Sequence, residues 1–302
     1  YLVISIRWAR RHPAAEPFQM PDAVTEVTPI TGESAAEAQT HAAWWLLALS
    51  AVAATVTSAV AAAVAGVVAI VQFGMQYLVY RSTGDLTDDP TILARATGFM
   101  GHWMTFSGLE MLVWCGALPL TLSLRPLRPL LPFVGLIGVA LLISFTRSVW
   151  LGSAAGVAIA ALYLPLRTLL RLLVPLAAVG IVASGLIWHR LSMSFLLGGF
   201  RLEMLDVGLR MIRDHPLFGV GPERVYAEFS AYYLGNNLQN FYYGHLHNNF
   251  VQIGAERGLL CLAAFVWLLA QIALDLRRRA RSPNPTVKWM AVGGLSVLGG
   301  FI

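Results

Sequence analysis

Long apolar stretches separated by short polar connections dominate the sequence. About 20 apolar residues cross the hydrocarbon core of a bilayer as a helix, and six stretches approach or exceed that length: residues 42–66, 103–124, 130–145, 149–166, 172–188 and 249–274. The sequence stops inside another apolar stretch, 289–302, and begins with a short one, 1–6. We expect one all-α, polytopic membrane domain over residues 1–302, a helical bundle that looks cut at both ends.

The segments around the first span are expected to differ from it. Residues 67–80 are too short for a second crossing, and Gln72, Gln76 and Tyr80 fall on one side of a helix, which favours an interfacial helix. Residues 7–41 are expected to form a cytoplasmic linker, because the part from 32 to 41 is polar and acidic.

The composition excludes several classes of protein. Hydrophobic residues make up 57% of the chain and charged residues only 12%, with a mean hydropathy of +0.65, whereas soluble domains are about 25% charged. Soluble enzymes, disulfide scaffolds and disordered regulators are therefore excluded. The two cysteines, Cys115 and Cys261, lie inside apolar runs and read as small buried hydrophobes. The net charge of +5 does not predict a nucleic-acid partner, because most basic residues cluster beside apolar segments.

Basic residues also predict the orientation of the spans. They occupy alternate connections, which are cytoplasmic by the positive-inside rule: Arg7, Arg10 and Arg11; Arg125 and Arg128; Arg167 and Arg171; Arg277, Arg278, Arg279, Arg281 and Lys288. Residues 81–102, the turn around Arg147, and a large loop, 189–247, are then expected on the outer, periplasmic side.

The large loop is expected to carry short amphipathic helices. From Arg201 to Arg213, apolar residues recur at spacings of three and four, and the apolar face predicted from them comprises Leu202, Leu205, Leu209 and Ile212. The pair His215-Pro216 ends this helix, and residues 219–222 form a turn.

Arg147 is the first candidate for chemistry. The stretch 130–166 is barely long enough for two crossings, so the turn Thr146-Arg147-Ser148 is expected at the outer membrane interface. A guanidinium group binds phosphate oxygens with two parallel hydrogen bonds. The alternative is an arginine at a helix end that only reaches for the interface.

A second candidate cluster, His245-Leu246-His247-Asn248-Asn249, lies where the large loop meets the last complete span. Imidazole accepts a proton near neutral pH, and a neighbouring amide can orient it. Helix capping and interface anchoring are the alternative roles. Metal binding by His245 and His247 is less favoured, because no acidic or cysteine ligand accompanies them at a diagnostic spacing.

These segments together resemble a known family. The resemblance is carried, in chain order, by four segments: Arg95-Ala96-Thr97-Gly98-Phe99-Met100-Gly101-His102; Ser144-Phe145-Thr146-Arg147-Ser148-Val149-Trp150; Arg201 with His215-Pro216-Leu217-Phe218-Gly219-Val220-Gly221; and His245-Leu246-His247-Asn248-Asn249 through Glu256-Arg257-Gly258-Leu259. In order and in expected outward placement they are similar to the bacterial O-antigen ligase and O-antigen polymerase superfamily.

The resemblance implies an inner-membrane glycosyltransferase that moves a glycan from undecaprenyl diphosphate to an acceptor hydroxyl at the periplasmic face, without a metal, nucleotide or other cofactor. It implies that Arg147 and Arg201 hold the diphosphate and that the His-X-His-Asn motif activates the acceptor. We take His247 as the base, since it adjoins Asn248 and is nearer the span, with His245 assisting. Supporting roles are expected for Asn248, His102, Arg210 and Glu256.

Several alternatives stay open. Arg201 could instead belong to a solvated face paired with Glu203 or Asp206. A ligase that uses lipid A core as acceptor is preferred, over a polymerase that joins glycan repeat units and an oligosaccharyltransferase that modifies protein. A transporter is the alternative from another class, but it predicts internal repeats and ionisable residues at mid-membrane. The sequence has no repeat, and Glu110 is the one acid well inside a predicted span.

Overall fold

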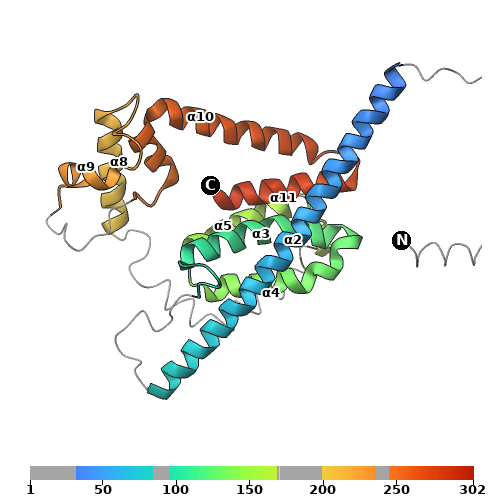
Figure 1. The fold of residues 1–302 in the computed structure, drawn as a ribbon, viewed down its shortest axis with the longest axis horizontal. Coiled ribbons are helices and arrows are strands. Elements are labelled where there is room, and N and C mark those ends of the chain that lie inside the picture. The colour runs from blue at the N-terminus through green and yellow to red at the C-terminus, as the bar shows by residue number, and fades with distance from the viewer. Residues whose placement is uncertain (1–31, 84–95, 169, 171–198, 236–244) are drawn as a thin grey trace, which may run out of the picture. The chain divides into compact units, whose positions relative to one another are not determined.

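The structure, a computed structural model, describes residues 32–83, 96–168, 170, 199–235 and 245–302 (Figure 1). Within these ranges the chain forms helices and no strand, which confirms the all-α class. The elements in chain order are α2 (Gly32–Thr83), α3 (Trp103–Ser123), η2 (Arg125–Leu130), α4 (Leu131–Ile143), α5 (Arg147–Ala161), α8 (Gly199–Asp214), α9 (Val225–Tyr232), α10 (Asn249–Arg279) and α11 (Pro285–Phe301). The described residues belong to two compact units, 32–47 and 48–302.

Among the described residues, four helical segments are long and apolar enough to cross a membrane: Ala53–Leu78, Trp103–Ser123, Arg125–Ile143 and Asn249–Arg279. A multi-pass membrane protein is thereby confirmed, and three of these segments coincide with predicted spans. The predicted span 172–188 lies outside the described residues. The predicted span 149–166 corresponds to the shorter helix α5.

The first predicted span needs correction. Its place is taken by Ala53–Leu78 within the continuous helix α2, so the interfacial helix predicted for residues 67–80 is wrong. Residues 32–41 are helical too, where a linker was expected. The polar Gln72, which suggested an interface, is instead satisfied inside the protein: its side chain bonds to the backbone of Thr97 and Gly98 at 2.9–3.1 Å.

Helices α3, α5 and α11 pack through small residues. The hydroxyl of Ser296 in α11 donates to the carbonyl oxygen of Gly156 in α5 at 2.8 Å. A methyl group added to Gly156 would lie 2.7 Å from the Ser296 carbonyl oxygen, and one added to Gly293 would lie 2.8 Å from that of Gly116 in α3. Lipid-embedded helices commonly associate in this way, because small residues let their backbones approach.

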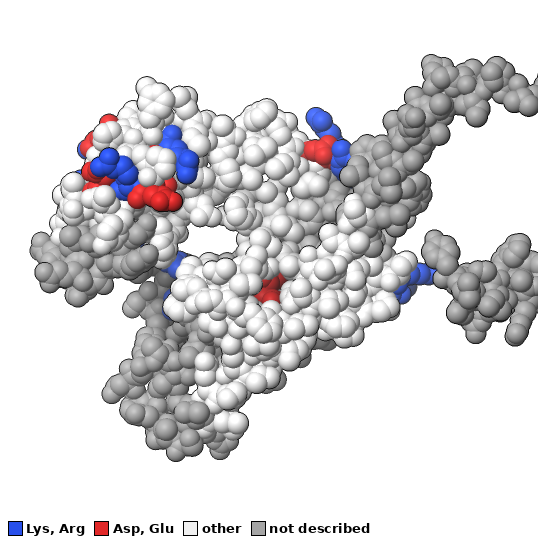
Figure 2. All heavy atoms as spheres, viewed as in Figure 1, with Lys and Arg blue, Asp and Glu red and all other residues white. Residues whose placement is uncertain are grey.

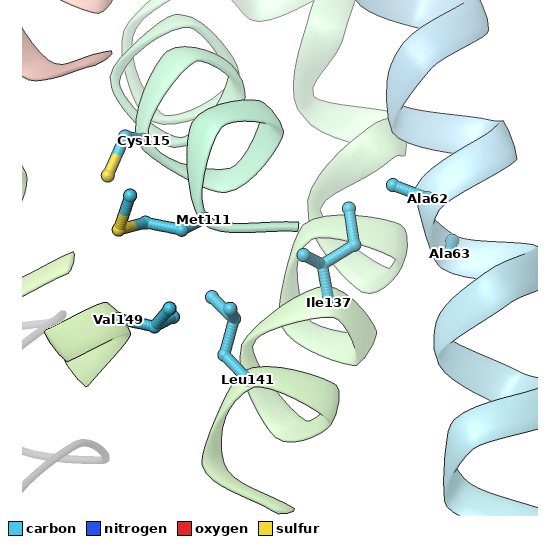
Figure 3. Packing of buried hydrophobic residues seen from close by; sticks show 7 residues of the cluster. All are labelled: Ala62, Ala63, Met111, Cys115, Ile137, Leu141 and Val149. Carbon is cyan, nitrogen blue, oxygen red and sulfur yellow. The ribbon is translucent and has the colours of Figure 1, made fainter. Parts of the chain in front are cut away.

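A second set of contacts joins α2 to α4, α3 and α5. Figure 3 shows Ala62 and Ala63 of α2 facing Ile137 of α4, with Met111 of α3 and Val149 of α5 further along the same cluster. A neighbouring cluster buries Phe106 of α3 against alanines of α2 and α4. Together these contacts fix the end of the bundle where α3 and α5 begin.

Helices α8 and α9 pack against the start of α10 around larger side chains: Met204, Val207, Met211, Val225, Phe229, Leu246 and Ala255. Helix α8 ends at Asp214, just before His215-Pro216, as predicted. Charged side chains gather over α8 and α9, whereas the face over α3 and α4 shows few (Figure 2).

The predicted apolar face of α8 is only partly right. Leu202 and Leu209 are exposed, about half accessible, and the buried face is made by Met204, Val207 and Met211. Gly208 explains the difference, because its missing side chain leaves room for Leu246 and Val251 against the helix. The close approach at Gly208 therefore sets which side of α8 faces inward.

Helix α10 is broken at Gly258, whose φ of 80° and ψ of 174° are not helical. The break frees backbone groups that the loop after α8 takes up. Val220 N–H donates to the Ala255 carbonyl at 2.8 Å and Gly221 N–H to the Glu256 carbonyl at 3.0 Å, while Leu259 N–H donates to the Pro216 carbonyl at 2.7 Å. The turn predicted for residues 219–222 is not found at that position: turns lie at 216–218 and 222–223, and the segment between them bonds to the backbone of the broken helix.

Candidate active site

Arg147 is the first residue of α5, rather than part of a hairpin turn as the sequence suggested. The turn comes just before it and is buried: Ser144, Phe145 and Thr146 are at most 5% exposed. Phe145 has a left-handed backbone with φ of 48°, uncommon for a bulky residue. Its ring packs near Phe73 and Trp150, at 5.9 and 6.2 Å between centroids. These contacts fix the backbone that leads into Arg147.

Hydrogen bonds tie this turn to the start of α3. Ser107 Oγ lies 3.2 Å from Thr146 Oγ1 and 2.7 Å from the carbonyl oxygen of Trp103. Just before α3, the Nδ1 atom of His102 accepts from Met104 N–H at 3.2 Å and caps the helix, and its ring stacks on Trp103 at 4.0 Å. The first turns of α3 and α5 therefore lie side by side.

Gln72 holds the segment in front of His102. Its amide nitrogen donates to the Gly98 carbonyl at 2.9 Å, and its amide oxygen accepts from the N–H groups of Thr97 and Gly98 at 3.1 and 3.0 Å. This role of Gln72 could not be predicted from the sequence, because its partners Thr97 and Gly98 lie more than twenty residues further along the chain.

The two histidines come together at the turn before α10. The rings of His245 and His247 lie 4.2 Å apart between centroids, and Leu246 between them is buried. His247 is exposed and has a left-handed backbone with φ of 54°. Strained backbone of this kind is frequent at functional sites, and here it turns the chain into the helix.

The surroundings lower the pKa of His247 below its usual 6.5. Partial desolvation contributes most, followed by electrostatic interactions with His245 and Arg201. Both effects disfavour the imidazolium form. The neutral ring, which can accept a proton, is therefore the prevailing form at neutral pH.

A hydrogen-bonded relay fixes this turn from the side of α10. Gln252 Oε1 accepts from Leu246 N–H at 2.7 Å, and Gln252 Nε2 donates to Glu256 Oε1 at 2.7 Å. Asn248 Oδ1 accepts from Phe250 N–H and Val251 N–H, each at 3.0 Å, and caps α10. Glu256 is only 8% exposed, so its carboxylate holds Gln252 from inside the protein. In the sequence, the spacing of four residues between Gln252 and Glu256 was the feature that could have predicted this hydrogen-bonded pair.

The arginines of α8 differ in their pairing. Arg210 Nε binds the Asp206 carboxylate at 2.8 Å, and Glu203 accepts from the Tyr233 hydroxyl at 2.9 Å. The two acids considered as partners for Arg201 are thus engaged elsewhere, and no ion pair of Arg201 occurs among the described residues. Arg201 stands in the first turn of α8 and is exposed. Its charge acts on His247, while that of Arg210 is neutralised locally.

A cavity of about 640 Å³ connects the two parts of the site. Ser148, which follows Arg147, and Asn249, which follows Asn248, both line it. Met104 and Thr105, just after His102, line it as well, and the remaining wall is mostly apolar or glycine from α3, α5 and α11. The starts of α3, α5 and α10, which carry the sequence motifs, therefore meet around one cavity.

This arrangement combines an arginine beside a largely apolar cavity with a neutral histidine close to a second arginine. Such groups can stabilise an anionic leaving group and accept a proton from a hydroxyl. Within the described ranges, no group of three or more His, Cys, Asp or Glu side chains is arranged to hold a metal ion.

Residues 132–266 match the model of the O-Antigen ligase family. This match supports the O-antigen ligase/polymerase superfamily for the matched region. No curated protein matches the chain. The O-antigen ligase region includes Arg147, Arg201, both histidines and Glu256, whereas His102 and Gln72 precede it.

The match also locates the region's parts in the fold. It begins near the start of α4 and ends inside α10 beyond the break at Gly258. The ligase-type region thus spans both Arg147 at the start of α5 and the histidine turn. The match and the membrane-spanning helices together support a multi-pass membrane glycosyltransferase of the O-antigen ligase/polymerase type.

Proposed function

We propose that this protein transfers a glycan from undecaprenyl diphosphate to an acceptor hydroxyl at the periplasmic face of the bacterial inner membrane. The observation that carries the proposal is the shared cavity, because Ser148 and Asn249 bring the start of α5 and the histidine turn to one place. Its mostly apolar wall suits a donor whose lipid part stays in the bilayer. Arg147 directly precedes the lining residue Ser148, and His247 lies two residues before the lining residue Asn249.

The reaction needs two kinds of help. The anomeric carbon of the donor glycan loses its bond to the diphosphate oxygen and gains one to the acceptor oxygen, and the acceptor proton must leave. Arg147 and Arg201 stabilise the negative charge that grows on the departing diphosphate. His247 takes the proton from the acceptor hydroxyl as general base. Its lowered pKa keeps it neutral and ready for this step.

His245 and Asn248 assist in different ways. The His245 ring lies 4.2 Å from that of His247, and electrostatic interaction with His245 helps to lower the pKa of His247. Asn248 caps α10 and keeps the turn in register with the cavity. Glu256 acts through Gln252 on the backbone of the turn. His102 caps α3 beside the cavity, and Arg210 shapes α8 through its pair with Asp206.

We propose the ligase reaction, with lipid A core as acceptor. Ligase and polymerase share the donor and the groups that act on it, so the acceptor alone distinguishes them. The test is a reconstituted reaction with purified protein, undecaprenyl-diphosphate-linked glycan, and either lipid A core or a second donor molecule. Glycosylated lipid A core supports the ligase. Lengthened lipid-linked glycan in both reactions identifies a polymerase, and no transfer to either acceptor contradicts the proposed class.

A control separates chemistry from folding in this assay. The His247→Ala protein should bind the lipid-linked donor as tightly as the unchanged protein does, yet form product much more slowly. A preparation that fails in both binding and transfer points to misfolded protein rather than to a wrong acceptor.

A further inference from the structure

The break in α10 divides this helix into two parts of different length. Leu259–Arg279 is 21 residues long, which corresponds to about 31 Å of helix and matches the hydrocarbon core of a bilayer, about 30 Å. The part before Gly258 adds nine residues, about 13 Å. At the far end, Arg277, Arg278 and Arg279 occupy the last turn, where basic residues mark a membrane boundary. Gly258 therefore lies at the opposite boundary.

The loop after α8 is fastened to that boundary. Pro216 accepts a hydrogen bond from Leu259 N–H at 2.7 Å. The backbone at Gly258 approaches Leu217 and Phe218 so closely that a side chain there would collide with them. The height of Leu217 and Phe218 relative to the bilayer is thus set by the start of the span.

The side chains at this junction are apolar and uncovered. Phe218 is 77% exposed and Leu217 56%, next to Leu259 at 46% and Leu260 at 61%. Arg257, also exposed, precedes the break. Soluble proteins rarely expose such contiguous apolar surface unless it binds something. At an interface between water and lipid, by contrast, apolar side chains beside a cation are stabilised by acyl chains and headgroup phosphates.

We propose that Leu217 and Phe218 form a bilayer-inserting wedge, which together with Leu259, Leu260 and Arg257 seats the α8–α9 region on the lipid headgroups. The occupant of this surface is the bilayer itself, because the surface is continuous with the membrane span of α10. The wedge fixes the height of the histidine turn, since residues 216–221 and 255–259 are joined by three backbone hydrogen bonds. This role is independent of which acceptor the protein uses.

The test measures lipid and water contact at single positions. In a Cys261→Ser background, in which Cys115 is buried, Phe218→Cys is labelled with a small fluorophore and the protein is placed in lipid nanodiscs. Tyr226→Cys is the matched control, because Tyr226 is also aromatic and 59% exposed but lies on α9 between the ion-paired Arg224 and Glu228. Nitroxide-bearing lipids and aqueous iodide serve as quenchers.

The label at 218 should lose most of its fluorescence to nitroxide lipids and little to iodide, with the opposite result at 226. Equal quenching at both positions by iodide, without lipid quenching at 218, overturns the proposal. Shielding of 218 from both quenchers overturns it as well, because a second copy or a protein partner would then cover the wedge. Leu217→Cys repeats the measurement if Phe218→Cys does not give folded protein by size-exclusion chromatography.

A second experiment tests the energetic role. Replacing both Leu217 and Phe218 by serine leaves the backbone hydrogen bonds of the loop in place, because those bonds use only main-chain atoms. The label at Leu260→Cys, in the Cys261→Ser background, should then become more accessible to iodide than in the chain with the wedge intact. Unchanged accessibility would show that the wedge does not hold the region against the bilayer.

Discussion

The region of α3, α5 and α11 and the region of α8, α9 and early α10 hold their functional groups by different means. In the first, backbones touch through glycine and serine, and Arg147 follows a buried turn. In the second, bulky side chains form a core and a glutamine relay fixes the histidine turn. Close backbone packing allows little adjustment, whereas a hydrogen-bonded turn on a small core can be changed at one position. In the proposed mechanism, the donor contact of Arg147 then depends on the first region, whereas proton transfer and the donor contact of Arg201 depend on the second.

The largest expected effect separates these two tasks. His247→Ala should lower turnover by about 10²–10⁴-fold, the usual contribution of a general base, while the affinity for the lipid-linked donor is retained. Turnover and donor affinity are measured in the same detergent, with His245→Ala as the control that keeps most activity. If His245→Ala is inactive and His247→Ala is active, His245 is the base and His247 assists. If both variants are active, the base does not lie in this turn.

Arg147 tests the donor side of the comparison. Arg147→Lys keeps the charge but loses the planar fork that holds two phosphate oxygens, and loss of such a stabilising group costs about 10²–10³-fold in rate. We expect transfer to fall at the low end of that range and donor affinity to fall with it. Arg167→Lys, beyond the other end of α5 and exposed, is the control and should be unaffected. Full activity in the Arg147→Lys protein would exclude a bidentate phosphate contact.

The packing difference can be tested through stability. Gly156→Ala should destabilise the protein by about 1–3 kcal/mol, as overpacking does, because the new methyl group would lie 2.7 Å from the Ser296 carbonyl oxygen. Gly108→Ala in α3 meets nothing within 4 Å and should be neutral or stabilising by up to about 1 kcal/mol. Unfolding in detergent is followed for both variants. Equal midpoints would show that the glycine contacts are not what holds these helices.

A smaller effect is expected in the pH dependence. Since the pKa of His247 lies below 6.5, kcat/KM should stay high as the pH falls through 6.5 and decline only at lower pH, when the ring becomes protonated. Arg201→Gln removes a positive neighbour, so the pKa of His247 should rise and the decline should begin at higher pH. Arg210→Gln should leave the decline in place, because Arg210 is paired with Asp206. An unshifted profile in Arg201→Gln would contradict the coupling between α8 and the histidine turn.

No effect at all is expected from metal removal. The positive charge at the diphosphate is supplied by arginines in the proposed reaction, so a chelator should leave transfer unchanged in detergent-solubilised protein. Activity lost with EDTA and restored by a divalent ion would assign the charge stabilisation to a metal instead.

The features that were predictable from sequence are those set by local patterns. The end of α8 follows from His215-Pro216, because proline cannot continue a helix. The span that becomes α3 follows from an apolar run of suitable length. The motif order indicated the family, and the match to residues 132–266 bears this out.

The features that were missed depend on contacts between distant residues. Gln72 looked like an interfacial residue because its partners, Thr97 and Gly98, are joined to it only in the fold. The inward face of α8 was misassigned because the space beside Gly208 is filled by Leu246 and Val251. The break of α10 was also missed, since Gly258 lies inside the predicted span 249–274 and its freed backbone groups find partners only in the loop after α8.

The serine-to-glycine bond between α11 and α5 has a consequence for biosynthesis. Helix α5 is synthesised before Ser296 leaves the ribosome, so the groove that receives α11 on α3 and α5 stays open until α11 has been made. A messenger truncated before the codons for α11 would yield a chain with its earlier spans inserted but this groove unfilled. Such a chain would differ from the complete bundle by its uncovered glycine face rather than by an unfolded span.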